Sequence, residues 1–322
     1  MTCAKLMSSS QKDVGKRLSL RLRIGVILAP LALFSQLSTA ACLGMALHAH
    51  RGSAQHPENS LSAVRSALSG GFDGVEIDVQ QLRDGKWVLH HDPMTSRHSS
   101  VPSQMVRGFD SAGWKVLRLP GRNGGPSDER AAFLSDVAAA VAPFQQVLNI
   151  EIKQVFDKCH TASSLAKDLG SAVASGRWLL TSLDRRHLAC ARQADPHGYL
   201  GLIVLDPRSI ALNDRTAAAA ARFLKPLNLS ADWLRRFRSD VQAPVGVHVD
   251  VQSLRDNPGL MRDAAAQGVA VFTYGLNGDA SHIQALRDSH ARSGFRPSGA
   301  IIDGDPGAFC ASLSRPKGLP TN

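Results

Sequence analysis

Short apolar runs alternate with amphipathic stretches along most of the chain from residue 45 onward. Eight of the runs are short and β-rich, and we predict strands over 45–50, 74–80, 146–153, 178–183, 200–206, 245–250, 269–274 and 299–303. Apolar residues spaced three and four apart predict helices between most of them, over 58–71, 131–142, 162–176, 260–268 and 281–294. A strand–helix alternation repeated eight times predicts an α/β fold, the (β/α)8 TIM barrel.

Two segments interrupt this alternation. Residues 93–131 are rich in Ser, Gly, Pro and Arg, and we expect a small irregular insertion over one face. Residues 207–243 are rich in Ala and Arg and predict a helical connection longer than a standard crossover. The alternative fold is an open, doubly wound sheet, but the first predicted strand is not followed by a glycine-rich phosphate-binding motif.

The segment between VEIDV and WVLHHD is QQLRDGK, which is too short for a parallel crossover. Its Asp84-Gly85 pair is typical of a hairpin turn. We therefore predict a short hairpin after the second strand. Folding the chain back about the turn brings residues 90–92 opposite residues 76–78, so His91 should lie beside Glu76 and Asp78.

The N-terminus has the pattern of a secretory signal. A basic stretch, KRLSLRLR, precedes the apolar IGVILAPLALF and then the small residues SQLSTAAC. The apolar run is too short to span a bilayer as a helix. We expect residues 1–41 to be a signal peptide with cleavage near Ala40, and residues 42–322 to form the exported domain. The alternatives are a lipoprotein signal that acts through Cys42 and a buried helix.

Composition adds limits on partners. The 322 residues are 43% hydrophobic and 20% charged, which is typical of a globular protein, and the formal net charge is +10. Residues 42–322 account for only +5 of that charge, so the basicity does not predict nucleic-acid binding. Past the N-terminus no segment is long and apolar enough to be a transmembrane helix.

Four cysteines follow the predicted signal: Cys42, Cys159, Cys190 and Cys310. They show no CxxC or Cys/His spacing, which argues against a zinc site. Export would place them in an oxidising compartment, where a Cys159–Cys190 disulfide is one alternative and unpaired core thiols are the other.

Polar side chains interrupt the apolar runs where the predicted strands end. His50 and Arg51 end the first strand, Glu76 and Asp78 lie late in the second, and Glu151 and Lys153 end the third. In a β/α barrel these ends meet at one rim, where catalytic groups gather.

Three carboxylates at one rim repel each other unless a cation lies among them, and oxygen ligands favour Mg²⁺ or Ca²⁺. Arg51 and Lys153 suit a phosphate. His50 and His91 can serve as an acid and a base near neutral pH. Together these groups predict cleavage of a phosphodiester.

The motifs HRGSAQHPENS, VEIDVQQLRDGKWVLHHDP and NIEIK, in this order over residues 48–153, resemble those of the glycerophosphodiester phosphodiesterase family. The resemblance implies a phospholipase C-like phosphodiesterase barrel that hydrolyses small glycerophosphodiesters to glycerol 3-phosphate and an alcohol. It implies that His50 and His91 are the acid/base pair, and that Glu76, Asp78 and Glu151 hold one divalent metal ion. It places Arg51, Glu58 and Lys153 at the phosphate, with Glu58 and Asn59 ordering the first loop.

The C-terminal half departs from the family pattern. Phe272-Thr273-Tyr274 stands where the family has Trp-Thr-Val-Asn, and we expect Phe272 to supply the aromatic wall for the substrate. The last strand ends in Asp303-Gly304-Asp305-Pro306, where the family has Thr-Asp-x-Pro. We expect His48 and His90 to point away from the faces that carry His50 and His91, and to be structural.

Three hypotheses remain for function. The first is an exported metal-dependent glycerophosphodiesterase. The second is a phospholipase D-like enzyme acting on lysophospholipid or sphingomyelin, which the polar residues 93–131 do not favour. The third is a barrel without turnover that binds phosphorylated ligands. The filled motif positions argue against this third hypothesis.

Overall fold

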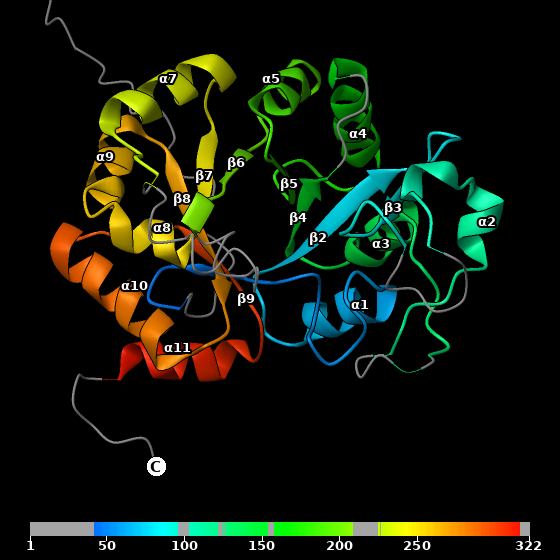
Figure 1. Ribbon diagram of the computed structural model, residues 1–322, viewed down its shortest axis with the longest axis horizontal. Helices are drawn as coiled ribbons and strands as arrows, with labels where there is room; N and C mark the ends of the chain where they lie inside the picture. Colours follow the sequence, from blue (N-terminus) through cyan, green and yellow to red (C-terminus); the bar gives the residue numbers. More distant parts are fainter. Residues whose placement is uncertain are drawn as a thin grey trace, which may run out of the picture. The chain divides into compact units, whose positions relative to one another are not determined.

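Eight parallel strands pair side by side and close into a barrel in the computed structural model (Figure 1). The structure describes residues 42–95, 103–121, 125, 127–153, 158–208, 225 and 227–315. The barrel strands are β1 (Ala46–Ala49), β2 (Gly74–Gln81), β4 (Val147–Ile152), β5 (Trp178–Ser182), β6 (Leu200–Val204), β7 (Val245–Asp250), β8 (Ala270–Leu276) and β9 (Gly299–Ile302). Closure occurs because β1 pairs with both β2 and β9. The predicted TIM barrel and all eight predicted strands are confirmed.

Helices follow most of the strands and cover the barrel. They are α1 (Leu61–Ser69), α3 (Leu134–Val141), α4 (Lys158–Ala172), α5 (Arg185–Ala194), α7 (Ala231–Val241), α8 (Val251–Asp256), α9 (Leu260–Gln267), α10 (Ala280–Ser293) and α11 (Pro306–Ser314). The five predicted helices are among them, and α7 lies in the predicted helical connection. Among the described residues, no helix combines the length and the apolar character needed to cross a bilayer. The predicted signal peptide lies outside the described residues.

The predicted hairpin forms after β2. Strand β3 (Trp87–Leu89) runs antiparallel to β2, with Gln81 opposite Trp87 and Val79 opposite Leu89. The next backbone hydrogen bond, from His90 N to Asp78 O, is 3.0 Å long. The counted register is therefore confirmed as far as His90, which lies opposite Asp78.

The predicted small insertion lies after β3. It contains the 3-10 helix η1 (Val106–Gly108) and the helix α2 (Ser111–Lys115), which lies close to β3 in Figure 1. Trp114 is fully buried in a second apolar cluster with Phe109 and Leu117. Within the described residues of the insertion, Trp114 and the apolar residues around it bury enough surface to order these two short helices.

Large rings fill the interior of the barrel below its rim. His48 and His248 flank the ring of Phe272, which stacks on His248 with the centroids 4.7 Å apart. Glycines on neighbouring strands make the space for the rings, because a Cβ at Gly74 would lie 2.6 Å from His48 and one at Gly299 would meet Phe272.

One predicted orientation is wrong. His48 was expected to point away from the face that carries His50, but its ring lies inside the barrel, 5.3 Å from Phe272. Residues two apart on a strand share a face, so His48 lies one layer below His50. The expectation for His90 holds, because its ring is buried against Trp114 and its Nε2 contacts the Met94 carbonyl.

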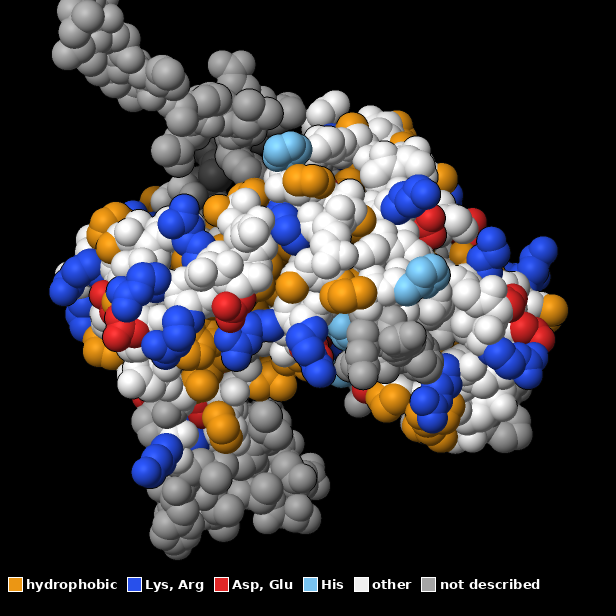
Figure 2. Space-filling model, turned by 90° about the horizontal axis from the view of Figure 1, so that it is seen from above, with side chains coloured by type: hydrophobic (Ala, Val, Ile, Leu, Met, Phe, Trp, Pro, Cys, Tyr) orange, Lys and Arg blue, Asp and Glu red, His pale blue; other side chains and the backbone are white. Residues whose placement is uncertain are grey.

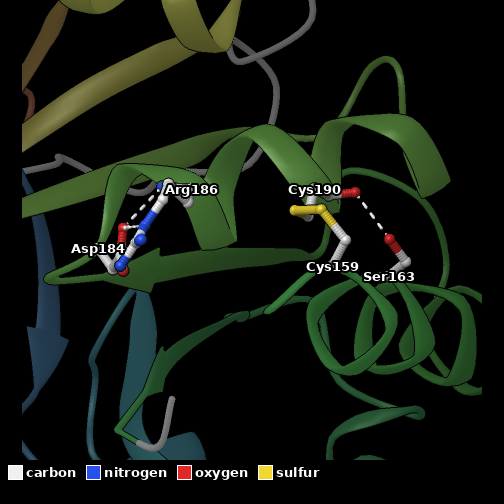
Figure 3. The surroundings of a disulfide bond; sticks show 5 residues. All are labelled: Cys159, Ser163, Asp184, Arg186 and Cys190. Atoms are coloured by element: carbon white, nitrogen blue, oxygen red, sulfur yellow. Dashed lines mark hydrogen bonds and ion pairs between the residues drawn. A yellow bond between two sulfur atoms is a disulfide. The ribbon is translucent and has the colours of Figure 1, made fainter. Parts of the chain in front are cut away.

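All four described cysteines form disulfides. Cys159 on α4 pairs with Cys190 on α5, as one of the two alternatives predicted, and Ser163 Oγ donates to the Cys190 carbonyl beside it (Figure 3). Cys42 pairs with Cys310 on α11, a pairing that the sequence analysis did not predict. The second bond ties the start of the barrel domain to its last helix.

Basic side chains are spread over the surface. Figure 2 views the face that carries α4, α5 and α7, and it shows Lys and Arg side chains mixed with Asp and Glu. Ion pairs such as Arg185–Asp240 and Arg235–Asp232 lie on these helices. The charge on this face is therefore partly balanced.

Candidate active site

Three carboxylates converge at the carboxyl ends of β2 and β4. Parallel pairing places Asp78 beside Glu151, and Glu76 lies two residues earlier on the same face of β2. Each residue offers an oxygen atom, and these oxygens all lie within 4.8 Å of one another. Glu76 and Asp78 are buried, and Glu151 is nearly so. The three side chains could hold a metal ion.

The electrostatics of this triad fit a cation. Burial and the negative charge of Asp78 raise the pKa of Glu76 to about 8 and that of Glu151 to about 7. Burial also acts to raise the pKa of Asp78, but the cationic Lys153 and Arg51 outweigh it and lower that pKa. A divalent cation among the three groups would offset their repulsion, which is what their oxygen-only donor set also favours.

Two cationic side chains border the triad. Lys153 Nζ lies 2.6 Å from a Glu151 oxygen and 3.2 Å from an Asp78 oxygen. Arg51 Nε forms an ion pair with Asp78 at 3.3 Å. The side chains of Lys153 and Arg51 are each 15% exposed, so both remain accessible to a small anion at the rim.

The loop after β1 carries Arg51 and is fixed to the triad. Arg51 and Asn59 both have positive φ, 54° and 56°, and the Asn59 backbone N donates to the Arg51 carbonyl. Arg51 N donates to a Glu76 carboxylate oxygen at 2.9 Å. Glu58 accepts a hydrogen bond from Arg51 Nη1 at 2.9 Å, so it orients the guanidinium.

Two imidazoles lie at the rim, each paired with a carboxylate. His50 Nδ1 is 2.9 Å from Asp303 Oδ1, and His91 Nδ1 is 2.7 Å from Asp92 Oδ1. Burial lowers the pKa of His50, but Asp303 and Glu76 more than offset this and raise it overall. Burial lowers the pKa of His91, with Asp78 acting in the opposite direction. The two environments move the two histidine pKa values apart.

Eight of the nine predicted site residues lie together at this rim. The exception is Phe272, which is only 7% exposed and lies in the ring layer below. The aromatic side chain that β8 sends to the rim is Tyr274, whose hydroxyl donates to the Val204 carbonyl on β6 at 3.1 Å. Tyr274 and Asp303 also lie at this rim and were not among the predicted site residues. Their signal was the departure from the family pattern at the ends of β8 and β9.

The comparison with protein families agrees with the geometry of this rim. The model of the glycerophosphoryl diester phosphodiesterase family matches residues 50–292 of the chain. The chain belongs to this family. The match includes the two histidines and the three carboxylates, and it extends through β8 and most of α10.

Several proteins similar to the chain carry the name of this family. A glycerophosphodiester phosphodiesterase of Caldanaerobacter subterraneus is 28% identical over 158 residues, which are 48% of this chain and 65% of the relative. A probable glycerophosphodiester phosphodiesterase 1 of Mycobacterium tuberculosis is 28% identical over 71% of this chain and 81% of its own. Another relative, the uncharacterized protein YqiK of Bacillus subtilis, is 34% identical, and the match spans only 44% of its length.

Solved structures share the fold. A phosphodiesterase of Oleispira antarctica, in complex with the product sn-glycerol-3-phosphate, has a TM-score of 0.65 at 21% identity, covering 84% of this chain and 97% of its own. A putative glycerophosphoryl diester phosphodiesterase of Silicibacter pomeroyi has the same TM-score at 16% identity, covering 84% of this chain and 93% of its own. At identities this low, the structural similarity supports the barrel fold of the chain and no more.

Proposed function

We propose that the chain is a metal-dependent hydrolase that converts small glycerophosphodiesters to glycerol 3-phosphate and an alcohol. The observation that carries the proposal is the convergence of three carboxylates, two cationic side chains and two imidazoles at one rim. Family membership and the glycerol-phosphate product of the Oleispira antarctica structure support this substrate class.

Glu76, Asp78 and Glu151 would hold the divalent cation, Mg²⁺ or Ca²⁺. When bound, the ion would offset the negative charge that develops on the phosphoryl oxygens. Arg51 and Lys153 would bind the remaining phosphate oxygens, and Glu58 keeps Arg51 in place through its hydrogen bond.

His50 and His91 would carry the protons. One imidazole accepts the proton of the attacking water as the new bond to phosphorus forms; if the substrate's own glycerol hydroxyl attacks instead, the first product is a cyclic phosphate, which water opens to glycerol 3-phosphate in a second step. The other gives a proton to the departing alcohol oxygen as its bond to phosphorus breaks. The opposite directions of their pKa shifts suit an acid and a base that work at the same pH.

Assays with glycerophosphocholine and with lysophospholipid or sphingomyelin test the proposal, each with Mg²⁺, with Ca²⁺ and with a chelator. We expect chelator-sensitive release of glycerol 3-phosphate from glycerophosphocholine. Cleavage of the lipids alone would favour a phospholipase D-like enzyme. No turnover with either metal would favour a barrel that only binds phosphorylated ligands.

We also propose that the mature chain is exported to an oxidising compartment. Two disulfides support this, since such bonds persist outside the reducing cytosol. The Cys42–Cys310 bond uses the thiol that lipid attachment would need, which favours cleavage by signal peptidase over lipoprotein processing. Mass spectrometry of the protein from the envelope fraction tests this, with an unlipidated N-terminus near residue 41 and no free thiols as the expected result.

A further inference from the structure

Asp303 and His50 leave the barrel side by side at the ends of two neighbouring strands. Parallel β1 and β9 pair up to Ala49 and Ile302, and His50 N then donates to the Ile302 carbonyl at 3.1 Å. The two following side chains meet, with His50 Nδ1 2.9 Å from Asp303 Oδ1. We propose that Asp303 is a positioning residue for His50, and this inference rests on the proposed function.

The geometry defines what Asp303 does to the imidazole. A carboxylate only accepts hydrogen bonds, so Nδ1 of His50 must carry the hydrogen. In the neutral ring the other nitrogen, Nε2, is then the one with a free lone pair, and it is the atom that exchanges a proton with substrate. Asp303 thus selects the tautomer, limits ring rotation and stabilises the imidazolium when it forms.

The pair is placed to act on reactivity more than on stability. The His50 and Asp303 side chains are 35% and 49% exposed, and ion pairs this exposed contribute little to the stability of a fold. The contact of His91 with Asp92 is local, because Asp92 is the next residue in the chain. Asp303 instead reaches His50 from a strand 253 residues away.

Other charged groups around His50 remain when Asp303 is changed. Glu76 on β2 favours the protonated imidazole, and Arg51 in the following loop disfavours it. A variant at position 303 leaves both in place and therefore isolates the effect of this carboxylate.

The contact joins residues that are far apart in the sequence. Only the pairing of β9 with β1 places Asp303 on His50.

Two variants test the inference. Asp303→Asn keeps a hydrogen-bond acceptor without the charge, and Asp303→Ala removes the acceptor as well. The matched control is Asp305→Asn, which changes the same charge two residues away at the N-cap of α11, where Asn also caps well. We expect kcat to fall about 10-fold or more in both Asp303 variants, but less than the roughly 100-fold loss caused by removing an acid/base imidazole. KM and the melting temperature should stay close to wild type.

The pH dependence and the NMR titration separate positioning from folding. In Asp303→Ala the titration of His50 should move to lower pH, both in the pH–rate profile and in the ¹⁵N shifts of its ring, assigned with His50→Gln. The wild-type ring should show hydrogen on Nδ1, and the variant a mixture of tautomers.

The outcomes distinguish failure of the proposed function from failure of the proposed role of Asp303. A wild-type protein that cleaves no diester overturns the proposed function, whereas NMR reports on the Asp303–His50 contact without turnover. An unchanged His50 titration and tautomer in Asp303→Ala overturns the inference, as does a loss of kcat matched by a lower melting temperature with an unchanged pH profile.

Discussion

Asn59 and Asp78 are joined by two hydrogen bonds that tie the first loop to the carboxylate triad. Asn59 Nδ2 donates to Asp78 Oδ2 at 2.8 Å, and the Asp78 backbone N donates to Asn59 Oδ1 at 2.9 Å. Asn59 is 3% exposed and has φ of 56°, a conformation that Asn tolerates better than most residues. The side chain therefore sets both the shape of the loop and the orientation of Asp78.

Replacing Asn59 should lower the stability of the fold. Asn59→Ala removes both hydrogen bonds and leaves buried groups of Asp78 without this partner, so we expect the free energy of unfolding to fall by about 2–3 kcal/mol. Asn59→Gly loses the same bonds but tolerates the positive φ, so it should be slightly more stable than the Ala variant. Urea denaturation measures the free energy of unfolding of the two variants. Wild-type stability in Asn59→Gly would contradict the role given to the two hydrogen bonds.

Glu151→Gln should affect metal activation more than thermal stability. The change removes a metal ligand but also removes one of three buried carboxylates that repel each other. We expect the Mg²⁺ or Ca²⁺ concentration for half-maximal activity to rise by about 10-fold or more. The melting temperature with chelator present should change little, because the variant loses the ion pair with Lys153 but also this repulsion, and Lys153 keeps its ion pair with Asp78. The control is Glu129→Gln, at a carboxylate outside the triad that accepts a hydrogen bond from Ser62 N. An identical metal titration in the two variants would remove Glu151 from the ligand set.

Neighbouring histidines should give opposite phenotypes. His91→Ala, like His50→Ala, should reduce kcat/KM by at least about 100-fold, the usual scale for loss of a general acid or base, with little change in stability. His90→Ala should lower the free energy of unfolding by about 2 kcal/mol, because His90 is buried against Trp114, and should leave turnover per folded molecule within a few-fold of wild type. Steady-state kinetics and thermal melts on the same preparations measure the activity and the stability of each variant. Near-normal activity in His91→Ala would exclude His91 from the mechanism.

The buried rings below the rim should make the fold sensitive to acid. Burial lowers the pKa of His48 to about 4 and that of His248 to about 3, against an ordinary value of 6.5. Because both folded-state values are lowered, the unfolded chain binds more protons below pH 6.5. The stability that these two rings contribute is complete above that pH and is lost progressively as the pH falls towards 4 and 3.

The expected loss at the lower limit is on the order of 3 kcal/mol for His48 and 5 kcal/mol for His248. Thermal melts between pH 7 and pH 4 measure it for the wild type and for His48→Gln, whose side chain does not titrate. The variant should lose less stability than the wild type over this range. Parallel pH dependence in the two proteins would show that protonation of His48 does not contribute.

The elements of the fold could be predicted from local patterns. Apolar periodicity and the Asp84-Gly85 turn depend on residues close in sequence, so the eight strands and the hairpin register at His90 and Asp78 followed from counting. The predicted orientation of His48 was wrong, because residues two apart on a strand share a face and His48 therefore points into the barrel as His50 does. The counting also missed the second apolar core, because Trp114 and Phe109 lie in a segment whose composition is otherwise polar.

The sequence by itself determined the barrel strands, the motif residues and the strand ends on which they lie. Tertiary structure alone decided that Asp303 meets His50, that Tyr274 and not Phe272 reaches the rim from β8, and that Cys42 bonds to Cys310. The physical reason is closure of the barrel. Pairing of β1 with β9 joins residues more than 250 positions apart, and the layer that an inward side chain occupies depends on the stagger between neighbouring strands.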